Sequence, residues 1–360
     1  MQKFLTLLLL FAPALSAEPW FVNRFDEQCA HCHVNPNGGG IRTEHETSDR
    51  KVDGGGDVRY LMSRWIRHAE GNTQKTWRTF LMTVDLGMRY RPFHEKLNLV
   101  YEARFLGIPE DRVFDNTFRT ATTRSFYALV DDLPFDSFIQ AGIYRPLFGN
   151  ASPDHQLLAQ KITSYALQGN TRAQTLRFRA VSVGVSPHIP FIKLHWIRKN
   201  ANFENDESEG WAFNMGANVE TLGASVDYSF WQHKNQGGGQ NQDVKLQSLH
   251  GGFFLDPVLL GYEILSTRRD DRNFELRKGE VQSIEAFLRF WRKLYGTVNY
   301  ANANATSALE AGKARQWRLG VRGFIGTNFD LGLFYEQLRE RTSLQETDDR
   351  FVVSQLHFFF

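Results

Sequence analysis

The feature that most constrains this chain is an alternation of apolar and polar residues that recurs along most of its length. One run places apolar side chains at every second position: Phe80, Met82, Val84, Leu86, Met88 and Tyr90. Similar runs occur near 97–105, 211–219, 224–230, 284–290 and 329–335. Period two is typical of β-strands with two different faces, and about ten residues suffice for a tilted strand to cross a bilayer. The pattern predicts an all-β, antiparallel fold.

The spacing of these runs favours a transmembrane barrel over a soluble sandwich. Short connections (91–96, 187–190, 220–223, 256–258, 325–328) alternate with longer polar ones at 198–210, 232–243, 268–280, 301–315 and 339–349. Short turns on one side and long loops on the other are typical of outer-membrane β-barrels. The last strand agrees, because Val352, Leu356 and Phe358 share one face, with Ser354 as its weak position.

The number of strands follows from parity. Candidate strands from residue 77 to the end give an odd number, and bacterial barrels of this type have an even one. The stretch 58–67, with imperfect alternation, supplies the missing strand. The sequence therefore predicts about 16 strands, with 14 as the fallback.

The first 17 residues form a signal peptide in this interpretation. Lys3 precedes an apolar stretch, and Leu15-Ser16-Ala17 ends it with small residues. This is the pattern of a secretory signal, and the stretch is too short to span a bilayer. We expect export and residence in the outer membrane of a Gram-negative bacterium.

A cysteine motif follows. Cys29-Ala30-His31-Cys32-His33 has the C-x-x-C-H spacing of c-type haem attachment, and the chain has only 2 cysteines. On a short helix Cys29 and Cys32 can form thioethers to one haem, and His33 can ligate its iron. A redox disulfide or a zinc half-site are the alternatives, but zinc would require further close ligands.

These features divide the chain into three parts. Residues 1–17 are the signal peptide, 18–56 a monohaem cytochrome segment with its linker, and 57–360 the barrel. The linker over 43–56 ends in the glycine triplet 54–56. The earlier run from Asn35 to Gly40 lets the backbone pass close to a flat haem ring, or it is a plain flexible linker. The haem segment is expected in the periplasm or within the lumen.

The sixth iron ligand is left open by the sequence. Met82, Met88 and Met215 fall in the lipid-facing phase and are excluded. The remaining candidates are His45, Met62, His68, His155 and His357.

Charged residues fall in the inward phase of the strands: Asp85, Arg89, Arg91, Glu102, Arg104, Asp227, Glu263, Glu285, Arg289, Arg318, Arg322, Asp330 and Glu336. They form either a plain solvated pore lining or a wall that receives the haem segment as a plug and binds the haem propionates through arginine. The stretch from Gly142 to Gly149 opens a long segment that reaches His155 and beyond. This segment either folds inward as a constriction or remains a surface loop.

An exported C-x-x-C-H segment joined to a barrel resembles the fused monohaem cytochrome–porin family of outer-membrane electron-transfer proteins. The resemblance is specific at Cys29, Cys32, His33 and the run from Pro36 to Gly40. It implies one covalent haem c and electron transfer across the outer membrane, with ferrous iron oxidation as the best-known role of the family. A metal-oxidising activity of this chain stays open.

The expected function is an electron conduit between an extracellular donor or acceptor and periplasmic cytochromes. The expected partners are outer-membrane lipid, a periplasmic soluble cytochrome, and an extracellular redox partner or small solute. A diffusion porin with a haem-bearing plug, or a docking barrel for a separate multihaem cytochrome, are the alternatives. The balance of 42 Lys and Arg against 40 Asp and Glu excludes a polybasic nucleic-acid binder.

Overall fold

A computed structural model gives the fold of the barrel. It describes residues 51–69, 71–93, 96–107, 122–135, 137–146, 148–149, 177–185, 191–200, 209–219, 222–235, 242–271, 274–306, 311–325, 329–341 and 345–359. The haem motif and the signal peptide lie outside these residues, so the predictions that concern them stay predictions. Among the described residues, no helix is long and apolar enough to cross a membrane.

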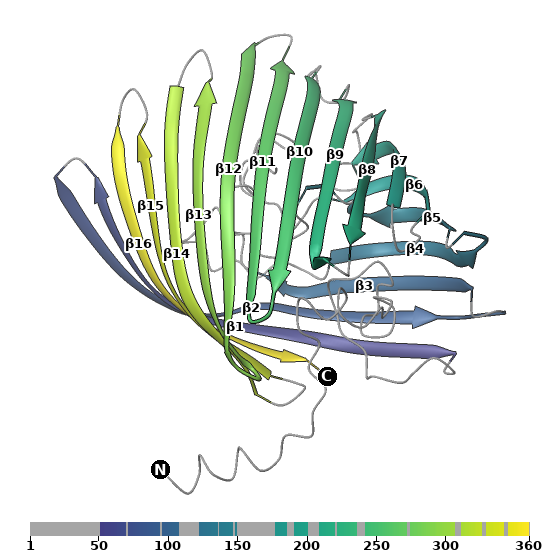
Figure 1. Cartoon of the computed structure of the whole chain (residues 1–360), viewed down its shortest axis with the longest axis horizontal. Coiled ribbons are helices and arrows are strands. Elements are labelled where there is room, and N and C mark those ends of the chain that lie inside the picture. The colour runs from purple at the N-terminus through teal and green to yellow at the C-terminus, as the bar shows by residue number, and fades with distance from the viewer. Residues whose placement is uncertain are drawn as a thin grey trace, which may run out of the picture.

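The described strands form one closed antiparallel barrel of 16 strands in chain order, which confirms the predicted fold and strand number (Figure 1). Their bounds are β1 Val52–Ala69, β2 Asn72–Tyr90, β3 Leu97–Gly107, β4 Thr122–Leu133, β5 Ser137–Tyr144, β6 Phe178–Val185, β7 Phe191–Asn200, β8 Glu209–Val219, β9 Ala224–Asn235, β10 Gln242–Leu255, β11 Val258–Asp271, β12 Phe274–Trp291, β13 Leu294–Thr306, β14 Ala311–Ile325, β15 Phe329–Arg341 and β16 Glu346–Phe359.

The two faces of the strands differ as the alternation predicts. In β6, Val181, Val183 and Val185 are 40–44% exposed, whereas Ala180 and Ser182 on the opposite face are at most 5% exposed. Met88 and Met215 are exposed on the outer face, as expected of lipid-facing residues. The core of a bilayer contains no water, so every backbone N–H and C=O group there must be paired within the protein. The paired strands meet this requirement, and their apolar outer face suits contact with lipid.

The first and last strands close the barrel. β1 pairs with β16 over a register that runs from Asp57 opposite Phe359 to Ala69 opposite Thr347. β1 begins at Val52, before the expected start of the barrel at residue 57. Gly54 to Gly56 therefore lie in a paired strand, and their interpretation as part of a linker was wrong. Glycine weakens a strand without preventing its hydrogen bonding, so composition alone was misleading here.

Several connections expected to be long are mostly strand. β11 continues to Asp271 and β12 starts at Phe274, so little of the loop expected over 268–280 is left. Lys278 pairs with Arg268 in this extension. The loops expected over 301–315 and 339–349 are shortened in the same way. Beyond the membrane band both faces are polar, so backbone pairing continues while the period-two signal disappears.

An apolar belt runs along the inner wall. Every strand from β3 to β13 contributes a buried apolar side chain to it, among them Val100, Tyr127, Phe178, Ile197, Trp231, Leu246, Leu265 and Val281. The strand register places many of them opposite one another, for example Trp231 opposite Leu246 and Leu265 opposite Val281. The inner wall is therefore partly apolar and partly charged. Most of its charged residues lie on the arc that runs from β14 through β1 to β4.

Candidate functional site on the inner wall

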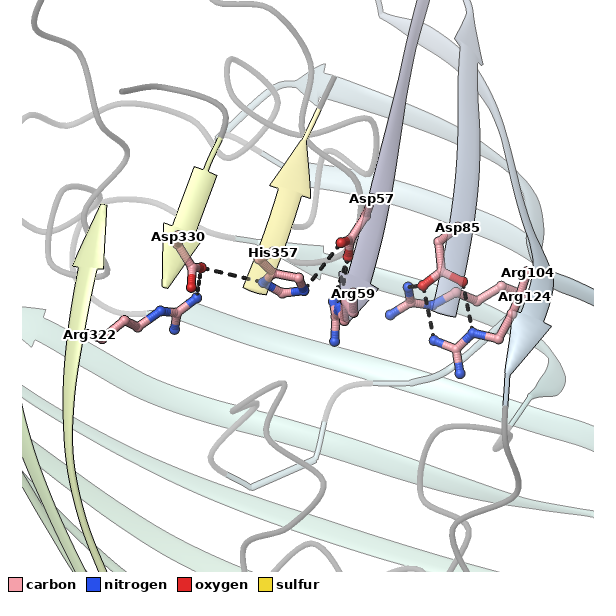
Figure 2. Close-up of polar contacts among 8 residues, drawn as sticks. All are labelled: Asp57, Arg59, Asp85, Arg104, Arg124, Arg322, Asp330 and His357. Atoms are coloured by element: carbon pink, nitrogen blue, oxygen red, sulfur yellow. Dashed lines mark hydrogen bonds and ion pairs between the residues drawn. The ribbon is translucent and has the colours of Figure 1, made fainter. Parts of the chain in front are cut away.

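Eight polar residues from seven strands form a charged network on that arc (Figure 2). Its members are Asp57 and Arg59 on β1, Asp85 on β2, Arg104 on β3, Arg124 on β4, Arg322 on β14, Asp330 on β15 and His357 on β16. Alternation along the strands and pairing between them bring these residues together, because Asp57 lies opposite Asp85 and Arg59 opposite His357.

Bidentate arginine contacts hold one side of the charged network. Arg59 donates through Nε and Nη2 to Oδ2 of Asp57, at 2.9 and 2.7 Å. Arg104 donates to both oxygens of Asp85 at 2.8 and 3.0 Å, and Nη1 of Arg124 adds a third contact at 3.0 Å. Charge-assisted bonds of this kind are stronger than neutral ones and fix the geometry of both partners.

His357 occupies the seam of the barrel between two carboxylates. Its Nδ1 lies 3.3 Å from Oδ2 of Asp330, and its Nε2 lies 3.2 Å from Oδ1 of Asp57. Arg322 pairs with the same Asp330 oxygen. The imidazole ring of His357 on β16 therefore links β15 to β1, as Figure 2 shows.

The charged network presents positive charge toward the lumen. The side chains of Asp57 and Asp85 are fully buried, whereas those of Arg124 and Arg322 are 29% and 34% exposed. Within these eight residues, and with His357 neutral, three carboxylates and four guanidiniums leave one net positive charge. Buried Glu102, which interacts with Arg124, and the neighbouring group of Arg89, Arg91 and Asp53 together add no net charge. Guanidinium groups match carboxylate and phosphate oxygens in geometry, so this wall suits an oxyanion.

A second arginine group extends the basic surface. Arg89 and Arg91 both contact Oδ2 of Asp53 at 2.6 Å, and the Arg89 and Asp53 side chains are almost fully buried. Residues Arg89, Arg91, Arg104, Arg322 and Asp330 had been predicted to face inward, and these contacts confirm it.

The segment after β5 turns inward at its start. Phe148 is buried and packs edge-on against Trp231, with ring centroids 6.4 Å apart. The backbone N–H of Gly149 donates to Oγ of Ser229 on β9 at 3.1 Å. The first residues of this segment thus lie against the inner wall, as the constriction hypothesis predicts, while His155 lies outside the described residues.

Gly149 provides a test of this contact. It has φ +62°, and an added Cβ would lie 2.6 Å from Oε1 of Glu263, which accepts a hydrogen bond from Ser248 at 2.7 Å. We expect Gly149→Ala to cost about 1–2 kcal/mol for the left-handed backbone and about 1 kcal/mol more for the displaced hydrogen bond. Gly71→Ala is the matched control, since Gly71 has φ +78° and no heavy atom within 4 Å of its added Cβ. Urea unfolding in detergent measures both; equal losses would contradict the crowding.

The other predicted haem residues are placed as follows. Cys29, Cys32, His33, His45 and His155 lie outside the described residues. Met62 is 46% exposed on the outer face, so it cannot ligate an iron inside the barrel.

The two remaining candidates for the sixth iron ligand are His68 and His357. His68 lies near the end of β1, where its Nδ1 is 3.0 Å from Oγ1 of Thr73. His357 faces inward as predicted, and each of its ring nitrogens lies within 3.3 Å of a carboxylate oxygen. Within the described part of the chain, no group of three or more His, Cys, Asp or Glu side chains could hold a metal ion.

Asp57, Arg59 and Arg124 were not identified from the sequence. A signal was present for the first two, because Asp57, Arg59 and Leu61 share one phase of β1. Their mixed polarity makes the alternation imperfect, and charged and apolar residues are both tolerated on this inner wall.

Solved structures support the fold. The chain is similar to OmpT of Vibrio cholerae (TM-score 0.60, 11% identity, 87% of this chain and 99% of that chain covered). It is also similar to the outer membrane channel DcaP of Acinetobacter baumannii (0.64, 13%, 86% and 97%) and to OprB of Pseudomonas putida (0.63, 8%, 87% and 95%). No protein-family model and no curated protein matches the sequence.

The chain therefore has the fold of a porin-like outer-membrane β-barrel. In this barrel a charged network of arginines and buried carboxylates spans the seam between β1 and β16.

Proposed function

We propose that this barrel is an outer-membrane electron conduit that carries one covalent c-type haem. The observation that carries the proposal is the motif Cys29-x-x-Cys32-His33 in a chain with an export signal and a barrel fold. Cys29 and Cys32 would form the thioethers and His33 would ligate the iron. The haem supplies reversible one-electron chemistry, and the barrel supplies a polar path through the bilayer.

The inner wall fits such a group. A porphyrin has an apolar face and two propionate carboxylates, and the wall combines the apolar belt with exposed guanidiniums such as Arg124 and Arg322. Arg322 or Arg124 would bind a propionate carboxylate, while the apolar side chains would exclude water from the ring.

The covalent connection permits this arrangement. Only 18 residues separate His33 from the start of β1 at Val52. A chain extends by at most about 3.6 Å per residue, so this length can cover several tens of ångströms. A haem attached at Cys29 and Cys32 can therefore reach the charged network from the end of the barrel where β1 begins.

A diffusion porin is the second candidate, and the structural similarity to channels such as DcaP favours it. In that case the positive inner wall would select small anionic solutes, and the haem segment would serve as a structural or regulatory plug.

One experiment separates the two functions. The purified protein is inserted into liposomes that enclose oxidised soluble cytochrome c, and a membrane-impermeant reductant is added outside. An electron conduit reduces the enclosed cytochrome. A parallel set of liposomes encloses a small anionic dye, and a diffusion porin releases it. Dye release without cytochrome reduction would contradict the conduit and support the porin.

A further inference from the structure

His357 lies within ion-pair distance of two buried carboxylates, those of Asp57 and Asp330. A neutral imidazole carries one N–H, so it can donate to Asp330 or to Asp57 but not to both. Nε2 of His357 and Oδ1 of Asp57 lie 3.2 Å apart, and neither of these buried atoms has a hydrogen-bond partner. Two carboxylates this close to the ring favour its protonated form, and Nδ1 can donate to Asp330.

Both positively and negatively charged residues surround the His357 ring. β1 contributes Asp57 and Arg59, β15 contributes Asp330, and β14 contributes Arg322 through its contact with Asp330. On β16 itself the ring lies beside Phe359, with centroids 4.9 Å apart. Protonation of His357 would raise the net charge of the charged network from one positive to two.

We propose that His357 is a proton-binding site that makes the affinity of the inner wall for oxyanions pH-dependent. The ligand is a carboxylate or phosphate group that contacts the partly exposed guanidinium of Arg322, which shares Asp330 with His357. It binds more tightly when His357 is charged, because the same buried wall then carries an additional positive charge. By linkage the bound oxyanion stabilises the protonated histidine to the same extent.

The sign of the effect follows from this linkage. The tighter oxyanion site is present below the pKa of His357 and is lost as the pH rises through it. Unperturbed histidine titrates near pH 6.5. A difference of about tenfold in oxyanion affinity between the two states would raise the titration midpoint by about one pH unit in excess phosphate.

The test is a pH titration of the His357 ring by NMR in detergent micelles, with ¹³C-labelled histidine and with or without inorganic phosphate. His357→Gln, which keeps a side-chain donor but cannot titrate, assigns the signal. His250→Gln is the control, since His250 faces inward on β10 and pairs with Asp227 at 2.9 Å. If His357→Gln does not fold, Asp330→Asn assigns the signal by its shift.

The expected result is a His357 midpoint that rises with phosphate and is unaffected by His250→Gln. A midpoint that is the same with and without phosphate in both the unmodified and the Cys29→Ala/Cys32→Ala protein would overturn the proposal, and so would a ring that does not titrate. The inference uses the oxyanion site of the proposed function, so the titration is repeated on Cys29→Ala/Cys32→Ala protein. A phosphate response only in that variant identifies haem propionates as the native occupant, and a response in both identifies free anions.

Discussion

Replacement of Cys29 and Cys32 by alanine will leave a folded barrel without covalent haem and without electron transfer. The thioethers require both thiols, and the chain has no other cysteine that could substitute for them. Pyridine haemochrome spectra and haem staining measure the haem, and reduction of cytochrome c enclosed in liposomes measures the transfer. We expect both signals to disappear completely.

His31→Gln is the matched control for this pair, because it changes the same motif without removing a thiol or His33. It should keep the covalent haem and the transfer. Retarded migration of the unheated protein in SDS gels verifies that each variant is folded. Covalent haem in the double alanine variant would refute the attachment site, whereas loss of haem with unchanged transfer would refute the conduit.

Asp85→Ala should strongly destabilise the barrel. Its carboxylate is fully buried and is the shared partner of Arg104 and Arg124. Removal of one member of a buried ion pair leaves an uncompensated charge, at a cost of about 3–5 kcal/mol. Arg124 is partly exposed and can regain water, so the lower end of this range is expected. Urea unfolding of the protein in detergent measures the difference.

Asp270→Ala is the control for Asp85→Ala. Asp270 pairs with Arg268 at 3.9 Å, and both side chains are 54% exposed. Exposed pairs contribute about 0–1 kcal/mol, so this variant should unfold almost as the unmodified protein does. Equal losses for the two variants would mean that the charged network adds little to the stability of the barrel.

The barrel architecture could be predicted from the sequence because a bilayer requires apolar and polar residues to alternate along each strand. The face of each residue in β6 and β15 follows directly from the period-two pattern. The inward position of Asp85, Arg104 and Asp330 was predicted for the same reason. Parity then identified β1, although its alternation is poor, because an odd number of strands cannot close an antiparallel barrel without one parallel pair.

The ion pairs could not be predicted from this alternation. Asp57, Asp330 and His357 are distant in sequence, and only the register of β1, β15 and β16 makes them neighbours. A change of register by one residue would move each side chain to the other face, and the hydrophobic pattern does not fix which charged residues meet. The apolar belt was likewise missed, since a lumen was expected to be polar throughout.

The sequence by itself determined the all-β class, the number of strands and which side of each strand faces the lipid, and it contains the C-x-x-C-H motif from which haem attachment is predicted. All of these depend on local order, namely the period of two and the spacing of two cysteines. The tertiary structure decided which charges neutralise one another and where the wall is apolar. Those properties depend on the register across sixteen strands and on closure of β1 against β16, which bring distant residues into contact.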